Sequence, residues 1–435
     1  MSSYVAEYQQ KLTTARNAVE KIEDGSAIVH GLAIAEPPAL LAAIADRVRE
    51  GSLKDIKIHS LLPREHAAKT VLSPDLSDSI QAYSWFVSGA DRGPVRVGLS
   101  YFVPNYFHQM PRIFREFIKI DVTVTTVSPM DKAGYFSFGT ANDFTSTVAR
   151  CCKKLIVEVN ENMPRVFGDS LLHISEVAAI VENHVPLLEM IPPEPKPEDE
   201  IIGKYIAEMI PDGATIQLGF GGIPNSITRC LKGHKDLGIH TEVFGPGMMD
   251  LIEKGVVTGR RKNLHPRKNV FTVAQGTRKM CEFMDDNPSM ESYSVSYVND
   301  PAVIAMNDNM ISINSILEVD LLGQCNAEFL AGSQFSGTGG QLDFVRGAFN
   351  SRGGKSILTF YSTTTDRQIS RVVPRFETGT VVTTPRMDTH YLVTEYGVVN
   401  LKGKSTRERA LDIISIADPK FRDDLLLEAE NMHLV

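Results

Sequence analysis

Short apolar runs alternate with longer amphipathic stretches along this 435-residue chain. An apolar run at 27–30 follows an Asp-Gly pair, and a stretch suited to a helix starts after Pro37. A short apolar run bounded by turn residues is typical of a buried strand, and proline is common at the start of a helix. Strands that alternate with helices predict parallel βαβ units, so we expect an open α/β sheet.

The second half of the chain repeats this plan in the same order. Residues 210–219 resemble residues 22–31, and residues 236–241 resemble residues 55–60. An Asp-Gly turn followed by a short apolar run is also common in unrelated βα units, so a single match could arise by chance. Two matches in the same order favour a duplicated fold. We therefore predict two similar open α/β domains with mainly parallel sheets.

A stretch rich in proline and charge separates the two halves. Residues 191–197 contain prolines at 192, 193, 195 and 197. Such a composition is typical of a stiff linker. We place the domains at 1–190 and 198–435, with 191–197 as the linker.

Composition narrows the class of protein. Hydrophobic residues make up 43% and charged residues 23% of the chain, and the net charge is −8. This mix excludes a disordered chain, a collagen and a disulfide miniprotein. The acidic balance makes nucleic acid an unexpected partner, so an anionic ligand would need a local site.

The cysteines and the N-terminus indicate the compartment. The five cysteines include no C-x-x-C pair, so neither a disulfide framework nor a metal site is expected. The first residues lead into a polar stretch without an apolar signal core, and no apolar run approaches the ~20 residues of a membrane span. We expect a reduced, cytoplasmic protein that does not bind a membrane.

The two copies differ at the end of their second predicted strand. The first copy has Leu61 there, and the second has Glu242, followed by a Gly-Pro-Gly turn at 245–247. Open α/β sheets bind ligands at the carboxyl ends of their strands, so Glu242 is a candidate functional carboxylate. The alternative is a glutamate in a surface loop.

Two glycine-rich segments of the second half are candidate ligand loops. Backbone N–H groups of such a turn before a helix can hold an anion or an oxyanion. Neither segment is a dinucleotide fingerprint, because both lack its third glycine, and the alternatives are a tight turn and a flexible connector. The segments contain Gly219, Phe220, Gly221, Gly222 and Ile223, and Gly339, Gly340 and Gln341.

Taken together, these motifs resemble the class I CoA-transferases of the acetyl-CoA hydrolase/transferase family, closest to its 4-hydroxybutyrate and butyrate:acetate CoA-transferase branch. The resemblance covers nearly the whole chain. It is carried by residues 127–136 and 157–165, by the turn at 221–225, by the His-Thr-Glu motif at 240–242, and by residues 337–347 and 394–401.

The resemblance implies a role for each candidate residue. It makes Glu242 the nucleophile, Gly219–Ile223 the oxyanion and CoA-contacting loop, and Gly339–Gln341 a second CoA-binding loop. It places the active site in a cleft between the domains, whose acyl side would involve Gly31, Leu61, Ser128 and Met130. The family continues from its glutamate with Met-Phe-Ser-Asp-Gly, whereas this chain has Val-Phe-Gly-Pro-Gly at 243–247, so the acyl pocket should differ.

The implied activity is ping-pong transfer of CoA between a short-chain acyl-CoA and a carboxylate through a glutamyl-CoA thioester. CoA is then a substrate, no cofactor is permanently bound, and a homodimer is expected. An acyl-CoA hydrolase would use the same glutamate. A non-catalytic CoA-binding module would not require Glu242, and a sugar-phosphate isomerase would not require a duplicated chain.

Overall fold

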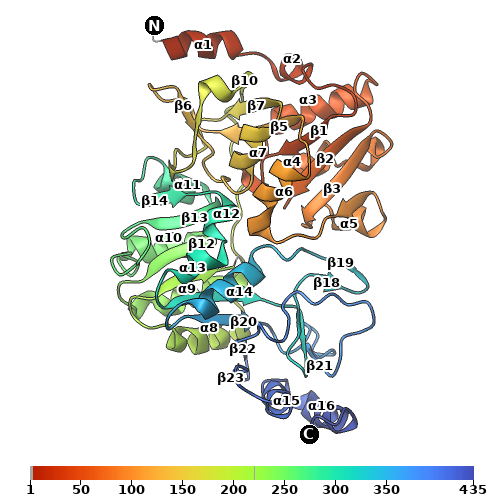
Figure 1. Cartoon of the computed structure of the whole chain (residues 1–435), viewed down its shortest axis with the longest axis vertical. Coiled ribbons are helices and arrows are strands. Elements are labelled where there is room, and N and C mark those ends of the chain that lie inside the picture. The colour runs from red at the N-terminus through yellow and green to blue at the C-terminus, as the bar shows by residue number, and fades with distance from the viewer. Residues whose placement is uncertain (1–2, 220) are drawn as a thin grey trace. The chain divides into compact units, whose positions relative to one another are not determined.

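The computed structural model describes residues 3–219 and 221–435, and the chain divides into two compact units (Figure 1). Unit 1 comprises Met1–Ile191, Val270–Val298 and Gln334–Gly337, and unit 2 comprises Pro192–Asn269, Asn299–Ser333 and Thr338–Val435. The sequence predicted a continuous second domain from 198 to 435, whereas two of its segments group with unit 1. The reason is that residues 272 and 274 exchange backbone hydrogen bonds with residues 140–143. Such a long-range contact cannot be predicted from a local sequence pattern.

A seven-stranded sheet forms the centre of unit 1 (Figure 1). All of its neighbouring strands run parallel. In spatial order they are β10 (Ala179–Glu182), β7 (Lys154–Val159), β5 (Val122–Val127), β1 (Ala27–His30), β2 (Ile56–Leu61), β3 (Ile80–Phe86) and β4 (Ser100–Phe102). Smaller pairings join β6 (Tyr135–Ser137) to β9 (Leu171–His173), and β8 (Phe167–Gly168) to β14 (Met290–Ser292) next to β13 (Asn269–Ala274).

Helices link the strands of unit 1. They are α1 (Ser3–Lys11), α2 (Ala15–Val19), α3 (Pro38–Arg49), α4 (Glu65–Lys69), α5 (Arg92–Arg96), α6 (Met110–Glu116), α7 (Thr145–Cys151), α11 (Arg278–Met284) and α12 (Val295–Val298). Single 3-10 turns occur at η1 (Ala33–Ala35), η2 (Pro74–Leu76), η3 (Phe107–Gln109) and η4 (Ile174–Glu176).

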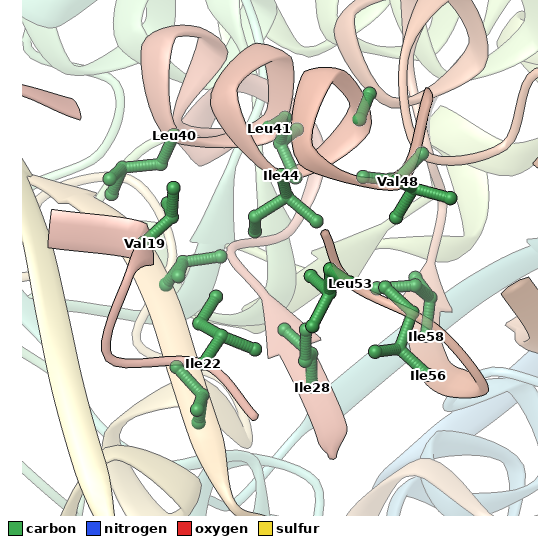
Figure 2. Packing of buried hydrophobic residues seen from close by; sticks show 14 of the residues in the cluster. Val19, Ile22, Ile28, Leu40, Leu41, Ile44, Val48, Leu53, Ile56 and Ile58 are labelled. Atoms are coloured by element: carbon green, nitrogen blue, oxygen red, sulfur yellow. The ribbon is translucent and has the colours of Figure 1, made fainter. Parts of the chain in front are cut away.

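Helix α3 shows how the apolar pattern builds the core of unit 1. A proline begins the helix, where its missing N–H costs no hydrogen bond. Leu40, Ile44 and Val48 follow at a four-residue spacing and therefore share one face of the helix. They pack on Ile28 of β1 and Ile58 of β2, and all five side chains are buried (Figure 2). A buried side chain of this kind contributes ~2 kcal/mol, so this face fixes the helix on the sheet.

Unit 2 contains a second sheet with the strand order β23-β22-β20-β15-β11-β12. Its strands are β23 (Gly397–Asn400), β22 (Tyr391–Thr394), β20 (Lys355–Thr359), β15 (Met310–Ser315), β11 (Thr215–Leu218) and β12 (Gly238–Phe244). The β22–β23 pair at the edge is antiparallel, and the four other pairs of neighbouring strands are parallel, as in unit 1. Short strands β16 (Glu318–Asp320), β17 (Cys325–Asn326), β21 (Val372–Val373), β18 (Phe329–Leu330) and β19 (Ser333–Gln334) form two small sheets.

The first helix of unit 2 begins at Pro197, the last residue of the predicted linker. They are α8 (Pro197–Met209), α9 (Gly222–Cys230), α10 (Pro246–Glu253), α13 (Pro301–Ala305), α14 (Gln341–Asn350), α15 (Thr406–Ser415) and α16 (Arg422–Asn431), with 3-10 turns η5 (Leu231–Gly233) and η6 (Pro419–Phe421). No helix within residues 3–219 and 221–435 has the length and apolar character needed to cross a membrane.

The strand register confirms that one α/β plan is used twice. In unit 1, Ile28 of β1 pairs with Ile58 of β2. In unit 2, Ile216 of β11 pairs with Ile239 of β12, and these are the residues that the repeated sequence matches to Ile28 and Ile58. A shift of one residue would turn every side chain to the opposite face, so equal register places equivalent residues at equivalent points of the two sheets.

Candidate active site

Glu242 lies near the carboxyl end of β12, the second parallel strand of unit 2. The amide Nδ2 of Asn299 donates a hydrogen bond of 2.5 Å to its Oε2 atom. Asn299 itself is fully buried and follows directly after α12. A carboxylate held by a buried amide has a fixed orientation, which is the first requirement for a positioned nucleophile.

A glycine makes room for this carboxylate. A Cβ atom at Gly340 would lie 1.9 Å from Oε2 of Glu242 and 2.1 Å from Nδ2 of Asn299, far inside van der Waals contact. Gly340 is the N-cap of α14, a helix of 10 residues. The Glu242 carboxylate therefore lies against the positive end of a helix dipole, which favours a negative charge there.

Burial and hydrogen bonds act in opposite directions on the pKa of Glu242. Burial raises the pKa of this carboxyl from 4.5 to about 7, and the charge of Asp343 adds to the rise. The hydrogen bonds from Asn299 and from the backbone of Gly340 lower the pKa in part. A carboxylate that is partly desolvated and still ionised near neutral pH can act as a nucleophile or as a base.

The first glycine-rich turn connects β11 to α9. Gly219 continues the strand through a backbone hydrogen bond to Ile313, and Gly221 has φ of +140°, which side chains rarely allow. Gly222 begins α9, and Ile223 is buried beside it. A cavity of unit 2 is lined by Gly219 and Gly221 together with Pro224, Val243, Pro246 and other residues of 192–248. The predicted contact residue Phe220 lies outside the described residues.

The second glycine-rich loop meets Glu242 at one residue. Gly339 has φ of +54°, and the following Gly340 contacts the carboxylate as described above. The Gln341 side chain is buried and donates from Nε2 to Oγ1 of Thr384 at 3.1 Å. Within unit 2 the structure thus brings Glu242 and Gly340 together, while Gln341 anchors the start of α14.

Two of the four residues predicted for the acyl side are packed inside unit 1. A Cβ atom at Gly31 would lie 2.3 Å from the carbonyl oxygen of Ala35 and 2.5 Å from Oγ1 of Thr125. Leu61 has 3% of its surface exposed and belongs to an apolar cluster with Trp85. A packing role accounts for both residues within the unit.

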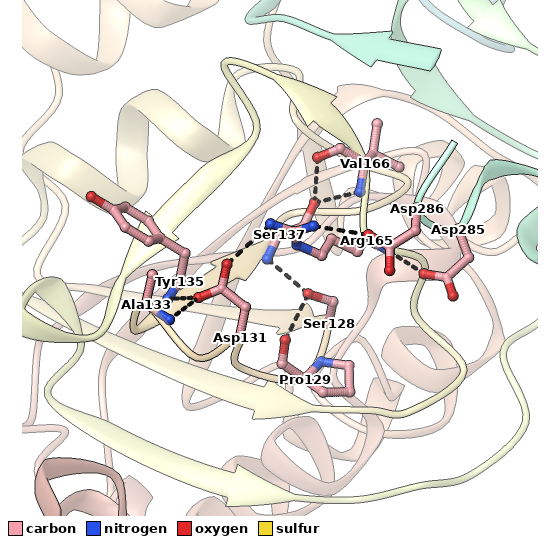
Figure 3. Close-up of polar contacts among 10 residues, drawn as sticks. All are labelled: Ser128, Pro129, Asp131, Ala133, Tyr135, Ser137, Arg165, Val166, Asp285 and Asp286. Carbon is pink, nitrogen blue, oxygen red and sulfur yellow. Dashed lines mark hydrogen bonds and ion pairs between the residues drawn. The ribbon is translucent and has the colours of Figure 1, made fainter. Parts of the chain in front are cut away.

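Ser128 and Met130 belong to the loop after β5. The Ser128 hydroxyl accepts from the backbone N–H of Ser137 at 2.8 Å and donates to the Pro129 carbonyl at 3.1 Å (Figure 3). Met130 packs against a cluster that contains Phe136. Figure 3 also shows Asp131 of this loop in an ion pair with Arg165, at 3.0 Å. Ser128 therefore holds the loop together, and an acyl-side role for these residues stays a prediction.

Sequence reasoning missed Asn299 and Asp343. Asn299 lies outside the segments that carry the family resemblance, and Asp343 lies within 337–347 but received no role there. Asn299 precedes an Asp-Pro pair, which marks only a helix start, and Asp343 lies in the first turn of α14, where acidic residues are common. Only the packing of α14 and residue 299 against β12 shows that both influence Glu242.

Comparison with known proteins identifies the class to which this fold and site belong. Residues 1–192 match the acetyl-CoA hydrolase/transferase N-terminal domain, and residues 276–429 match the acetyl-CoA hydrolase/transferase C-terminal domain. The chain belongs to the acetyl-CoA hydrolase/transferase family, as the sequence motifs predicted.

Individual relatives match the chain over its whole length. It is 42% identical to the succinyl-CoA:cyclohexane-1-carboxylate CoA transferase of Geobacter metallireducens, over 100% of this chain and 98% of that protein. It is 43% identical to the 4-hydroxybutyrate coenzyme A transferase of Clostridium kluyveri, over 97% of each chain. Among solved structures, RipA from Yersinia pestis is 48% identical over 100% of both chains, with a TM-score of 0.95.

Proposed function

We propose that this CoA-transferase moves CoA between a short-chain acyl-CoA and a carboxylate acceptor, with Glu242 as the nucleophile. The observation that carries the proposal is the Glu242 carboxylate itself. It is held by Asn299, fitted against Gly340, and raised in pKa to about 7 by burial. The proposed substrate pair is 4-hydroxybutyrate or butyrate with acetyl-CoA or acetate. The family resemblance and the C. kluyveri relative support it.

The first half of the proposed reaction transfers CoA to the enzyme. An oxygen of the Glu242 carboxylate attacks the thioester carbonyl, the C–S bond breaks, and a mixed anhydride and the CoA thiolate form. The thiolate attacks the glutamyl carbonyl carbon, the anhydride C–O bond breaks, and the first carboxylic acid leaves as its anion. Glu242 then carries CoA as a thioester.

The second half reverses these steps with the acceptor. Its carboxylate attacks the glutamyl thioester, thiolate leaves, and thiolate attacks the acyl carbonyl of the new anhydride. The new acyl-CoA leaves and Glu242 is regenerated. No net proton, water or phosphate is consumed, because the energy of one thioester is retained in the next, so ping-pong kinetics are expected.

Backbone donors are proposed to stabilise the oxyanions of these steps. The Gly221–Gly222 turn at the start of α9 can direct N–H groups toward an anion, and such a donor is worth about 3 kcal/mol in comparable enzymes. Phe220, Gly339 and Gln341 join this proposal as CoA-contacting positions through the family resemblance. Gly31, Leu61, Ser128 and Met130 join it on the acyl side in the same way.

Trapping of the intermediate tests the proposal. The purified chain is incubated with acetyl-CoA, reduced with borohydride, and digested for peptide mapping by mass spectrometry. The expected result is a reduced side chain at Glu242 alone. Glu242→Gln should show no reduction and no transfer, while Glu200→Gln, at an exposed carboxylate of α8, should keep both. Label elsewhere, or transfer by Glu242→Gln, would remove Glu242 as the nucleophile.

A hydrolase is the second candidate function, and the family description includes it. In a hydrolase, water would attack the same glutamyl thioester. Loss of acetyl-CoA is therefore measured with and without butyrate or 4-hydroxybutyrate. The transferase proposal expects slow loss alone and formation of the new acyl-CoA when an acid is added, whereas equal loss in both cases supports the hydrolase.

The expectations of a homodimer and of a cytoplasmic location remain proposals. The cytoplasmic proposal rests on the sequence alone, which has five cysteines and no C-x-x-C pair. Light scattering of the purified chain tests the first proposal, with a mass of twice 48.0 kDa expected for a dimer.

A further inference from the structure

A buried carboxylate lies under the first glycine-rich turn. Asp199 has 1% of its surface exposed, and it comes from the first turn of α8. Its Oδ2 accepts the backbone N–H of Lys196 at 2.8 Å, and its Oδ1 accepts the hydroxyl of Tyr361 at 2.6 Å. Both carboxylate oxygens therefore have fixed partners, which a buried charge requires.

The same carboxylate lies beside Gly222, where only a glycine leaves room for it. A Cβ atom at this position would lie 2.9 Å from Oδ2 of Asp199, so a side chain at residue 222 would displace the carboxylate. Helices α8 and α9 also approach closely, since a Cβ atom at Gly203 of α8 would lie 2.9 Å from Oγ of Ser226. Asp199 thus fills the space that Gly222 leaves open.

Tyr361 is itself held in place. It follows β20, and the next residue, Ser362, donates from its backbone N–H and its hydroxyl to the Glu395 carboxylate, at 3.0 and 2.6 Å. The Tyr361 phenol is half-buried, and burial and the Asp199 carboxylate raise its pKa. The phenol therefore stays protonated and donates to Asp199. Tyr361 thus links the segment after β20 to Asp199, and Asp199 lies beside Gly222.

We propose that Asp199 and Tyr361 are positioning residues that fix Gly222, and with it the start of α9 at Gly221–Gly222, for CoA transfer. The inference rests on the proposed function, because it assigns to this turn the donors that stabilise the oxyanion. Neither residue is proposed to touch substrate. Their contribution is to hold the turn in one geometry before the substrate binds, and a displacement of about 1 Å in such a group can cost about 100-fold in rate.

Tyr361→Phe is the sharpest variant, because it removes one hydroxyl and keeps the ring. Asp199→Asn is the second, because it keeps the side-chain volume and removes the charge. Tyr396→Phe is the matched control, since the Tyr396 hydroxyl donates to Oδ2 of Asp418 at 3.0 Å, the same kind of bond elsewhere in unit 2. Each full-length variant is mixed with acetyl-CoA, and the enzyme–CoA adduct is followed by rapid quench and intact-protein mass spectrometry.

Positioning predicts a separation of rate from affinity. The maximal rate of adduct formation should fall about tenfold in Tyr361→Phe and further in Asp199→Asn, with the half-saturating acetyl-CoA concentration changed less than about threefold. Tyr396→Phe should keep the wild-type rate. Thermal midpoints of the two tyrosine variants should fall by similar amounts, since each loses one hydroxyl hydrogen bond.

The outcomes separate this inference from the proposed function. Wild-type enzyme that forms no adduct at Glu242 would overturn both. Wild-type enzyme that forms the adduct, together with a Tyr361→Phe rate equal to that of Tyr396→Phe, would overturn the positioning role alone. If Asp199→Asn does not fold, Tyr361→Phe decides the question by itself.

Discussion

Units 1 and 2 place different side chains at equivalent points of their two sheets. Leu61 and Glu242 occupy matching positions near the carboxyl ends of β2 and β12. An equivalent helix, α7 before β7 in unit 1 and α14 before β20 in unit 2, contributes its first residues to the surroundings of each. In unit 1 the N-cap of that helix is Phe144, buried in the same apolar cluster as Leu61. In unit 2 it is Gly340, against which the Glu242 carboxylate is fitted.

The comparison shows that the fold offers the position but does not supply the chemistry. In unit 1 the position belongs to an apolar cluster and adds to the core. In unit 2 a glycine opens the space, and Asn299 and the helix N-terminus then hold a carboxylate there. The difference between a core residue and a candidate nucleophile therefore lies in the neighbours as much as in residue 61 or 242.

Placing a carboxylate in unit 1 should have the largest effect. Leu61→Glu would bury a charge among apolar side chains without a donor prepared for it, and we expect a loss of about 4 kcal/mol or more in the free energy of unfolding. Leu427→Glu, on the exposed side of α16, is the control and should be near neutral. Thermal unfolding of both variants measures the effect. A Leu61→Glu variant as stable as the control would show that unit 1 also accepts a carboxylate.

A side chain at Gly340, in the space that the Glu242 carboxylate occupies, should reduce activity more than stability. Gly340→Ala places a methyl group where Oε2 of Glu242 lies, so we expect transfer to fall about 100-fold or more. The control is Gly233→Ala, because nothing lies within 4 Å of a Cβ atom at that position. Steady-state CoA transfer with the folded variants is the measurement. Equal rates for both variants would contradict the close fit of Glu242 and Gly340.

The ionised Glu242 carboxylate should also lower the free energy of unfolding. The pKa of Glu242 is raised in the folded state, so the folded protein binds this proton more tightly than the unfolded chain. The free energy of unfolding must then decrease as the pH rises from 4.5 to about 7. Glu242→Gln should therefore be more stable than the wild type at pH 8, by about 1 to 3 kcal/mol, and equal to it near pH 4. Urea unfolding at the two pH values checks this, and a variant less stable at pH 8 would contradict it.

The smallest effect concerns the charge of Asp343 beside Glu242, the proposed nucleophile. The rate of adduct formation should rise with pH through about 7 and then level off, as Glu242 ionises. Asp343→Asn removes a negative charge that raises this pKa, so the profile should move to lower pH, by up to about one pH unit. Asp250→Asn, at an exposed position of α10, should leave the profile in place. A shift to higher pH in Asp343→Asn would contradict the assignment.

The sequence predicted the features that repeat and the features that form a local motif. The duplicated strands, the parallel sheets and the family followed from matched segments and short motifs, and the register of β1 with β2 and of β11 with β12 confirms the repeat. Glu242 stood out because its counterpart is Leu61. Asn299, Asp343 and Tyr361 did not, because they reach the site from separate segments through packing. The assignment of residues 270–298 to unit 1 depends likewise on long-range backbone hydrogen bonds.

The shared register also says where this protein tolerates change in length. Residues 31–55 connect β1 to β2, whereas the shorter segment 219–237 connects β11 to β12, and the pairing of the strands is the same in both units. The two copies therefore differ in the length of this connection, while the pairing of their strands is the same. A loop exchanged between the copies should be accepted at these junctions, whereas deletion of one residue within a strand would turn its buried face outward.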